Sequence, residues 1–210
     1  MVNKKALLDN KICITLYKTA FVLHSNNMLM FPWLSFVENA LNHLGISEYF
    51  VNQCVPSLDV FKSLVKSRLQ DHFMQSWFSS IENSPKCLVY KMYKHTFQFE
   101  YYLDCLPRNL ALSLLRFRIM NHKLPIEKGR FFNIERNRRI CHFCNHNRIG
   151  DEFHYLFECT HFLNLRKKYI KQYYFQNPNS LKISQLMNCN SDKELTNLAL
   201  FCKILLKIFN

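Results

Sequence analysis

The sequence predicts a mainly α-helical protein in which a helical bundle carries a small zinc-binding module. The 210-residue chain contains only three glycines and six prolines, whereas an all-β protein needs turn residues about every ten positions. Apolar residues recur instead at helical spacing along most of the chain. Three cysteines and one histidine also follow the spacing C-x2-C-x9-H-x4-C, a donor set typical of a zinc site.

The pattern of apolar residues divides the chain into three parts. We expect a helical spacer over residues 1–122, a basic zinc-binding module over 123–175, and C-terminal helices over 176–210 that pack back onto the module. Within the spacer, helical periodicity predicts helices over residues 3–23, 31–44, 57–80, 88–97 and 107–122.

Individual residues support the helices of the spacer. Leu7 and Leu8 begin the apolar stripe of the first helix. Gly45 follows the second helix directly, at the position where glycine most often ends a helix. The third helix has a broad apolar face that includes Leu69 and Phe73, so we expect it to pack between other helices.

The second half of the chain predicts shorter helices around the cysteines and a long one at the end. Residues 123–140 lack helical periodicity. Asp151 is placed to cap a short helix that carries His154. We expect helices over residues 152–157, 160–175, 183–187 and 192–209, the last with the apolar stripe of an amphipathic helix.

The charge of the chain is concentrated around the cysteines. The formal net charge is +13, and residues 104–172 contribute +8 of it, from 14 Lys or Arg against 6 Asp or Glu. Concentrated positive charge favours a polyanionic partner, and nucleic acid is the commonest one. An anionic membrane surface is the competing partner, which we regard as the weaker interpretation.

The nine cysteines indicate a reducing, intracellular location rather than a disulfide framework. Their number is odd, and no secretory signal is recognisable. The apolar run over residues 12–24 is interrupted by Lys18, so it suits neither a signal peptide nor a membrane span. We expect one metal site, with most of the remaining thiols serving as small core residues.

The spacing of the four donors predicts one structural zinc ion. A C-x2-C pair can form a tight turn whose amides point at the sulfurs, and His154 and Cys159 are separated by about one helical turn. Three thiolates and one imidazole close a tetrahedral site with no position left for water. The expected ligands are Cys141, Cys144, His154 and Cys159.

Alternatives to this ligand set remain open in the sequence. His142, His146 and His161 are neighbouring candidates for the nitrogen ligand, and the four residues can also be ordinary buried side chains. Asp151 or Glu152 is expected to accept the second ring N–H of the ligating histidine.

Basic residues interleaved with aromatic ones predict binding of RNA or DNA. Cations that follow a phosphate backbone, next to rings that can stack on bases, are what single-stranded nucleic acid requires. Phe131 and Phe132 can serve either for stacking or for a small core over the zinc, whereas we expect Phe143 and Phe153 to be core residues. The candidate nucleic-acid contacts are Arg116, Arg118, Arg130, Arg136, Arg138, Arg139, Arg148, Arg166, Lys167, Lys168 and Lys171.

No motif for catalysis is present in the sequence. There is no glycine-rich phosphate loop, no G-x-S-x-G, no H-E-x-x-H and no pair of adjacent aspartates. We therefore expect a non-enzymatic protein without a small-molecule substrate.

Several runs of sequence, taken together, resemble a known family. They are Leu115-Arg-Phe-Arg118, His122-Lys-Leu-Pro-Ile-Glu-Lys-Gly-Arg130, Arg139-Ile-Cys-His-Phe-Cys144, Gly150-Asp-Glu-Phe-His-Tyr-Leu-Phe-Glu-Cys159 and Leu165-Arg-Lys-Lys168. Over about residues 90–172 they are similar to the C-terminal helical and zinc-binding region of non-LTR (LINE-like) retrotransposon reverse transcriptases. The resemblance implies that the three cysteines and His154 ligate zinc, and that the module grips RNA or target DNA. No segment resembles the polymerase or the endonuclease of that family, so we expect an isolated tail segment.

Two functions are therefore expected from the sequence. The first is a zinc-stabilised nucleic-acid-binding segment that is itself non-catalytic. The alternative is a zinc-stapled structural or protein-interaction module, or a transposon relic, in which the arginines form only a solvated surface.

Overall fold

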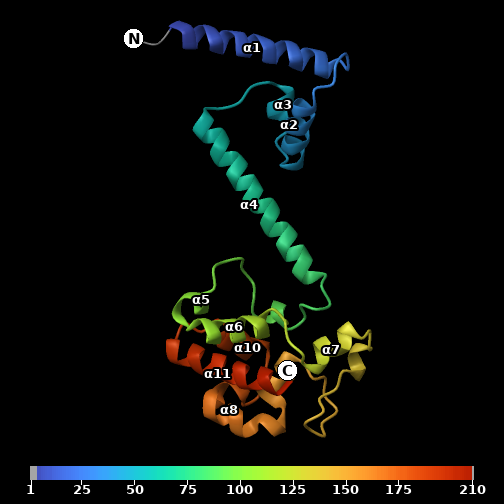
Figure 1. The fold of residues 1–210 in the computed structure, drawn as a ribbon, viewed down its shortest axis with the longest axis vertical. Helices are drawn as coiled ribbons and strands as arrows, with labels where there is room; N and C mark the ends of the chain where they lie inside the picture. The colour runs from blue at the N-terminus through green and yellow to red at the C-terminus, as the bar shows by residue number, and fades with distance from the viewer. Residues whose placement is uncertain (1–3, 210) are drawn as a thin grey trace. The chain divides into compact units, whose positions relative to one another are not determined.

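The computed structural model describes residues 4–209, with side chains from residue 11 onward, and 66 % of the described residues are helical (Figure 1). No β-strand forms within this range, so the predicted mainly α fold class is confirmed. The α-helices are α1 (Lys4–Ser25), α2 (Pro32–His43), α3 (Glu48–Val51), α4 (Leu58–Glu82), α5 (Tyr102–Cys105), α6 (Arg108–Arg118), α7 (Pro125–Phe131), α8 (Leu163–Tyr169), α9 (Gln172–Phe175), α10 (Ser180–Met187) and α11 (Asp192–Phe209). The 3-10 turns are η1 (Tyr90–Met92), η2 (Arg136–Arg138) and η4 (Thr160–Phe162), and η3 (His154–Glu158) is a π-helical turn.

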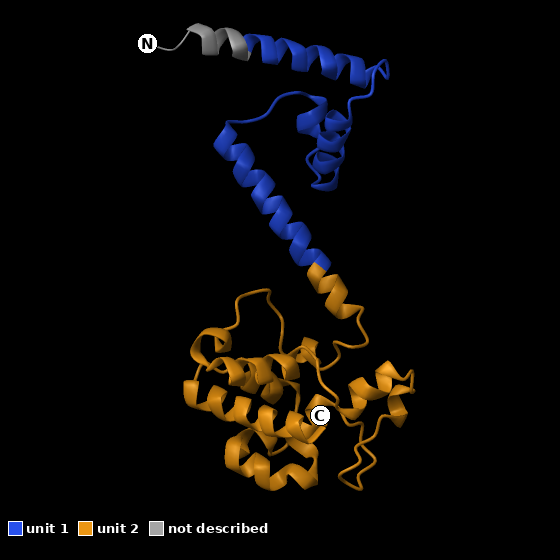
Figure 2. Ribbon diagram, in the orientation of Figure 1, with its two compact units in different colours: residues 1–76 blue, residues 77–210 orange. Residues whose placement is uncertain are grey.

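The chain forms two compact units, residues 1–76 and 77–210, and the boundary falls within α4 (Figure 2). The sequence instead placed the end of the first part at residue 122. Helix α6 belongs to the second unit because its Leu114 and Phe117 share one buried core with Leu198 and Cys202 of α11. The candidate metal residues lie in this second unit.

The first unit has a small core of its own. Leu34, Ile46 and Phe50 are buried in it. Gly45 ends α2 with a positive φ of 66°, and the Ile46 amide donates to the Leu41 carbonyl at 3.0 Å, as expected for a glycine helix stop. The predicted first helix agrees with α1 over residues 4–23, whereas residue 3 and the side chains of residues 7 and 8 lie outside the described part.

Helix α4 confirms the extent of the predicted helix over residues 57–80 but not its packing. Leu69 and Phe73 on its apolar face are about half exposed, at 54 % and 51 %. Ile81 is the buried residue of this helix. The expectation that α4 packs between other helices is therefore wrong for the structure described.

The predicted helix over residues 88–97 is also wrong, because residues of this segment form hydrogen bonds with distant parts of the chain instead. Only the 3-10 turn η1 forms there. The Tyr93 carbonyl accepts a hydrogen bond from the Asn188 side chain at 2.7 Å, and the Tyr93 hydroxyl donates to the Arg118 carbonyl at 2.8 Å. Val89 and Tyr93 are buried in the core of the second unit by this route.

Helices α6 and α11 lie side by side in the core of the second unit, with α8 against α11 (Figure 1). Helix α11 has the bounds that the sequence predicted. The helix predicted over residues 160–175 is divided, because Ile170 adopts an extended conformation and is buried. Helix α10 begins at Ser180, three residues earlier than predicted, since the Asn179 side chain caps it by accepting from the Lys182 amide at 3.0 Å.

The segment that the sequence left without helical periodicity contains α7. Pro125 occupies the first turn of this helix, where proline is tolerated. At its end, Asn133 has a positive φ of 53°, and the Ile134 amide donates to the Gly129 carbonyl at 2.8 Å. Helix α7 is therefore short, with Pro125 in its first turn and the left-handed Asn133 just after its end.

Candidate metal centre

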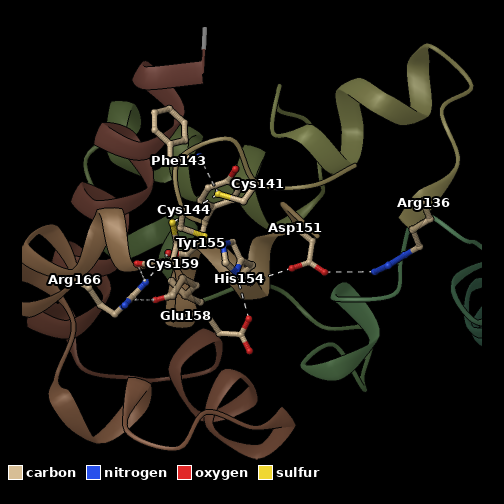
Figure 3. Close-up of polar contacts among 11 residues, drawn as sticks. Arg136, Cys141, Phe143, Cys144, Asp151, His154, Tyr155, Glu158, Cys159 and Arg166 are labelled. Carbon is tan, nitrogen blue, oxygen red and sulfur yellow. Dashed lines mark hydrogen bonds and ion pairs between the residues drawn. The ribbon is translucent and has the colours of Figure 1, made fainter. Parts of the chain in front are cut away.

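Cys141, Cys144, His154 and Cys159 converge in the second unit, so that one donor atom from each lies within 4.8 Å of the others (Figure 3). The Cys141 and Cys159 sulfurs are 3.8 Å apart, and the Cys144 sulfur is 3.4 Å from His154 Nε2. Cys141, His154 and Cys159 are buried, and Cys144 is partly buried. This group of three thiols and one imidazole can hold a metal ion.

A short backbone pairing shapes the first two donors into a turn. Ile140 and Ile149 form an antiparallel bridge, and the Cys141 amide donates to the Arg148 carbonyl at 2.8 Å. Inside the turn, the Phe143 amide points at the Cys141 sulfur from 3.4 Å. The tight turn predicted for the C-x2-C pair is therefore present, with one amide directed at the Cys141 sulfur.

A π-helical turn brings the other two donors together. In an α-helix, residues five apart point roughly 140° away from each other around the axis. Here the Cys159 amide donates to the His154 carbonyl at 2.8 Å, the i to i−5 bond of a widened turn. The helical run that leads into this turn starts at Glu152, and the Asp151 carboxylate before it accepts the His154 amide at 3.0 Å, as predicted. The widened turn explains how the H-x4-C spacing places both donors at one edge.

The partner of the His154 ring differs from the one expected. Nδ1 of His154 lies 3.3 Å from Glu158 Oε2, not next to Asp151 or Glu152. The Asp151 carboxylate caps the helix and pairs with Arg136 at 3.4 Å, and Glu152 instead faces His122 at 2.9 Å. The i, i+4 spacing of His154 and Glu158 is the sequence pattern that could have indicated this contact.

The other histidines considered as nitrogen ligands do not join the four donors. His142 and His146 are exposed. The ring of His161 packs against Phe143, with centroids 4.8 Å apart, and against Phe162. Among the described residues, His154 is the histidine of the group.

Burial and hydrogen bonding set the protonation of the donors. Burial raises the pKa of the Cys159 thiol to about 12 and lowers the pKa of His154 despite its contact with Glu158. For Cys141, burial opposes ionisation, but the neighbouring Tyr155 hydroxyl and the nearby backbone amides outweigh it and lower the pKa. The lowered pKa of His154 favours the neutral imidazole that binds a metal, and a metal ion would displace protons from the buried thiols.

Arg166 is a clamp behind the ligand turn rather than a surface cation. It is 2 % exposed, its Nε donates to the Leu156 carbonyl at 2.8 Å, and Nη2 donates to the Cys159 carbonyl at 2.9 Å (Figure 3). The Leu156 carbonyl lies within the π-helical turn, and the Cys159 carbonyl, which also accepts the Phe162 amide at 3.3 Å, lies directly after it. The prediction of Arg166 as a nucleic-acid contact is therefore wrong, because the guanidinium is enclosed.

Arg118 is wrong as a nucleic-acid contact for the same reason. It is 1 % exposed, and its guanidinium carbon lies 4.9 Å from the Tyr93 ring centroid and 5.1 Å from that of Tyr102. It pairs with Glu100 at 3.0 Å and donates to the Met187 carbonyl. These contacts tie α6 to η1, α5 and the end of α10.

Arg139 is half-buried and holds the segment after α7 in place. Its Nε donates to the Ile134 carbonyl at 2.8 Å and Nη1 donates to the Ile126 carbonyl at 3.1 Å. A Cβ on Gly129 would meet Arg139 Cγ at 2.5 Å, so the glycine makes room for this side chain. Two of the five N–H donors of Arg139 are therefore used inside the protein.

The remaining predicted cations are available to solvent to different degrees. Arg130 pairs with Glu127 at 2.7 Å, Arg136 with Asp151, and Lys171 with Glu194. Arg138 is 76 % exposed and only loosely paired with Glu135 at 3.4 Å. Among the predicted nucleic-acid contacts, those that are exposed and have no carboxylate in ion-pair range are Arg116, Arg148, Lys167 and Lys168.

The phenylalanines separate into two groups. Phe153 packs on Phe157 and lies partly buried against the core, as predicted. Phe143 contacts Phe162 and Phe209 but is 36 % exposed, so its prediction as a core residue is wrong. Phe131 and Phe132 are instead 79 % and 61 % exposed. The alternative expectation, that these two rings fill a small core over the metal centre, is therefore wrong.

Together the fold and the site define an all-α protein with a four-donor candidate metal centre. When the chain is compared with protein-family models, curated proteins and solved structures, none of them matches. Over the described part of the chain, no helix combines the length and the apolar character needed to cross a membrane.

Proposed function

We propose that the four donors hold one structural zinc ion. A tetrahedral zinc places two thiolates about 3.8 Å apart and a thiolate and an imidazole nitrogen about 3.6 Å apart. The corresponding separations here, 3.8 Å for Cys141 and Cys159 and 3.4 Å for Cys144 and His154, support this assignment. Thiolate and imidazole donors also favour zinc over magnesium or calcium, which prefer oxygen.

The zinc stabilises the fold and takes no part in a reaction. Four protein donors fill the tetrahedron, so the ion has no open position for water or substrate. A structural ion of this kind contributes its binding free energy to folding of the segment around it. Thiolates that are free or bound to zinc persist in a reducing compartment, so this proposal suits an intracellular location.

We further propose that the chain binds RNA or DNA through exposed cations around the zinc turn. Arg138 and Arg148 lie on the two backbone segments that pair next to Cys141, which is the observation that carries the proposal. Lys167 and Lys168 are exposed on α8, the helix that also supplies the clamp Arg166. Three thiolates around Zn2+ leave a formal charge of about −1, so the attraction for phosphate comes from these side chains.

The resemblance to the C-terminal region of non-LTR retrotransposon reverse transcriptases supports the same function. We propose that the chain corresponds to that tail, which holds nucleic acid without catalysing a reaction. The order of the donors and the basic residues on both sides of them support this proposal.

The proposal is tested by zinc content and by salt-dependent binding of the full chain. We expect one zinc per chain by elemental analysis, and binding of single-stranded RNA or DNA in fluorescence anisotropy. A plot of log affinity against log salt concentration should become less steep by about 1.4 in the double variant Arg138→Ala/Arg148→Ala, if both side chains contact phosphates of a single strand. Lys62→Ala/Lys66→Ala, which removes two exposed cations from the first unit, is the charge-matched control. Unchanged affinity and salt slope in the first variant would refute the basic surface.

A zinc-stapled protein-interaction module is the second candidate function. Large apolar side chains on the first unit favour it, since Leu16 is 64 % exposed, Phe36 is 73 % exposed and Trp33 is 48 % exposed. A chain that holds stoichiometric zinc but binds none of the nucleic acids tested would leave this candidate standing.

A further inference from the structure

A cleft of about 780 Å³ in the second unit combines exposed aromatic rings with cations. Its volume lies in the range of sites that hold a cofactor or nucleotide, roughly 300–1,000 Å³. Lys86, Lys123, Lys128 and Arg130 line it together with Phe131 and Phe132, and Glu127 is the acidic residue in its wall. The formal charge of these ionisable groups, four cations against one carboxylate, is +3.

The two phenylalanines are held at this cleft by the backbone, not by a hydrophobic core. They stand at the end of α7, where the left-handed Asn133 and the bond from the Ile134 amide to the Gly129 carbonyl stop the helix. Their ring centroids are 5.3 Å apart, and the ring planes are nearly perpendicular, at 87°. The two ring faces therefore point in different directions and remain accessible.

Exposed rings of this kind are costly unless they are covered by a ligand. Burying apolar surface is favourable, so two adjacent phenylalanines in water gain free energy when a flat apolar partner covers them. A nucleobase offers such a face, and the phosphates attached to it are attracted by the net positive charge of the wall. Bases inside a duplex do not expose their faces, which restricts the partner to unpaired bases.

We infer that this cleft binds unpaired bases of single-stranded nucleic acid, with Phe131 and Phe132 as the stacking surface and the lysines of the wall near the phosphates. Lys128 is exposed, whereas Arg130 is partly neutralised by Glu127 at 2.7 Å. This inference rests on the proposed nucleic-acid binding and deepens it by assigning a base-dependent subsite. The cations around the zinc turn supply the base-independent part of the affinity.

The experiment compares probes that have the same phosphates but differ in their bases. The zinc-loaded full chain is titrated by anisotropy with oligo(U), oligo(dT) and an abasic strand, each of about 12 nucleotides, within the site sizes known for single-strand binders. The variant is Phe131→Ala/Phe132→Ala. The control is Phe99→Ala, which removes another phenylalanine of the second unit that is 67 % exposed and lies outside the cleft.

Each stacked base that is lost should weaken binding of oligo(U) or oligo(dT) by about 5- to 150-fold. The salt slope and the affinity for the abasic strand should stay at the wild-type value, and Phe99→Ala should change neither. Zinc content and circular dichroism report whether the double variant is folded. Ultraviolet cross-linking of oligo(U) to the wild-type chain, mapped by mass spectrometry, locates the contact without any substitution and should identify the peptide with Phe131 and Phe132.

Two results would overturn this inference without refuting the proposed nucleic-acid binding. If the wild-type chain binds the abasic strand as tightly as oligo(U), or if the folded double variant binds oligo(U) like the wild type, the stacking subsite is refuted while nucleic-acid binding stands. If the chain binds none of the three strands, the proposed function and the subsite both fall.

Discussion

Replacing Arg166 with methionine is expected to loosen the metal centre without changing the surface charge. The guanidinium is buried and donates to the Leu156 carbonyl at 2.8 Å and to the Cys159 carbonyl at 2.9 Å. Hydrogen bonds from a charged donor are each worth about 1.5–3 kcal/mol net. The Leu156 carbonyl, which would lose this donor, adds a desolvation cost, whereas the Cys159 carbonyl keeps the Phe162 amide. Removing the buried cation returns part of its own desolvation penalty.

From these opposing effects we expect Arg166→Met to destabilise the second unit by about 3 kcal/mol. If metal binding and folding of the ligand turn are coupled, zinc affinity should fall by about two orders of magnitude, since 1.4 kcal/mol corresponds to a factor of ten. The assays are zinc competition against a chelating dye and thermal unfolding of the zinc-loaded chain.

The neighbouring residue provides the control for this prediction. Lys167 is an exposed cation on the same helix, so Lys167→Met should leave zinc affinity unchanged and weaken only nucleic-acid binding. Zinc affinity of Arg166→Met within threefold of the wild type, with an unchanged melting temperature, would refute the role of Arg166 as a clamp.

Three further predictions follow from the described contacts. Cys159→Ser should lose most of the zinc measured by elemental analysis, because Cys159 is fully buried and, among the described residues, no cysteine besides Cys141, Cys144 and Cys159 belongs to the group; full retention would place the fourth donor elsewhere. Arg118→Met should destabilise the chain by about 2–4 kcal/mol in urea unfolding, because Glu100 keeps only Lys94 as a cationic partner and the Met187 carbonyl loses its donor, and the exposed Arg116→Met, two residues away, should not. The Lys171 ammonium lowers the pKa of Glu194, so this carboxylate stabilises the fold above its unfolded pKa and the gain is lost as pH falls through its folded pKa. Glu194→Gln should therefore flatten the acid limb of stability between about pH 5 and pH 3, by less than about 1 kcal/mol because Lys171 is exposed; an acid limb as steep as that of the wild type would contradict it.

Local chemistry in the sequence determined the elements whose structure needs few distant contacts. The bounds of α11 follow from its regular apolar stripe, and Gly45 marks the end of α2 because its left-handed conformation is cheap only for glycine. The four donors of the candidate metal centre are likewise apparent from their spacing. The cap by Asp151 was also apparent, because an aspartate before a helical run is a local feature.

The tertiary structure alone decided which cations are internal and which are on the surface. Arg118 and Arg166 look like solvated arginines in the sequence, but each is buried and donates to backbone carbonyls of other elements, Arg118 to Met187 and Arg166 to Leu156 and Cys159. Whether Phe131 and Phe132 join a core was also open, because exposure depends on where α7 ends and what packs near it. The π-helical turn that aligns His154 with Cys159 has no periodic pattern of its own, so only the folded chain decided it.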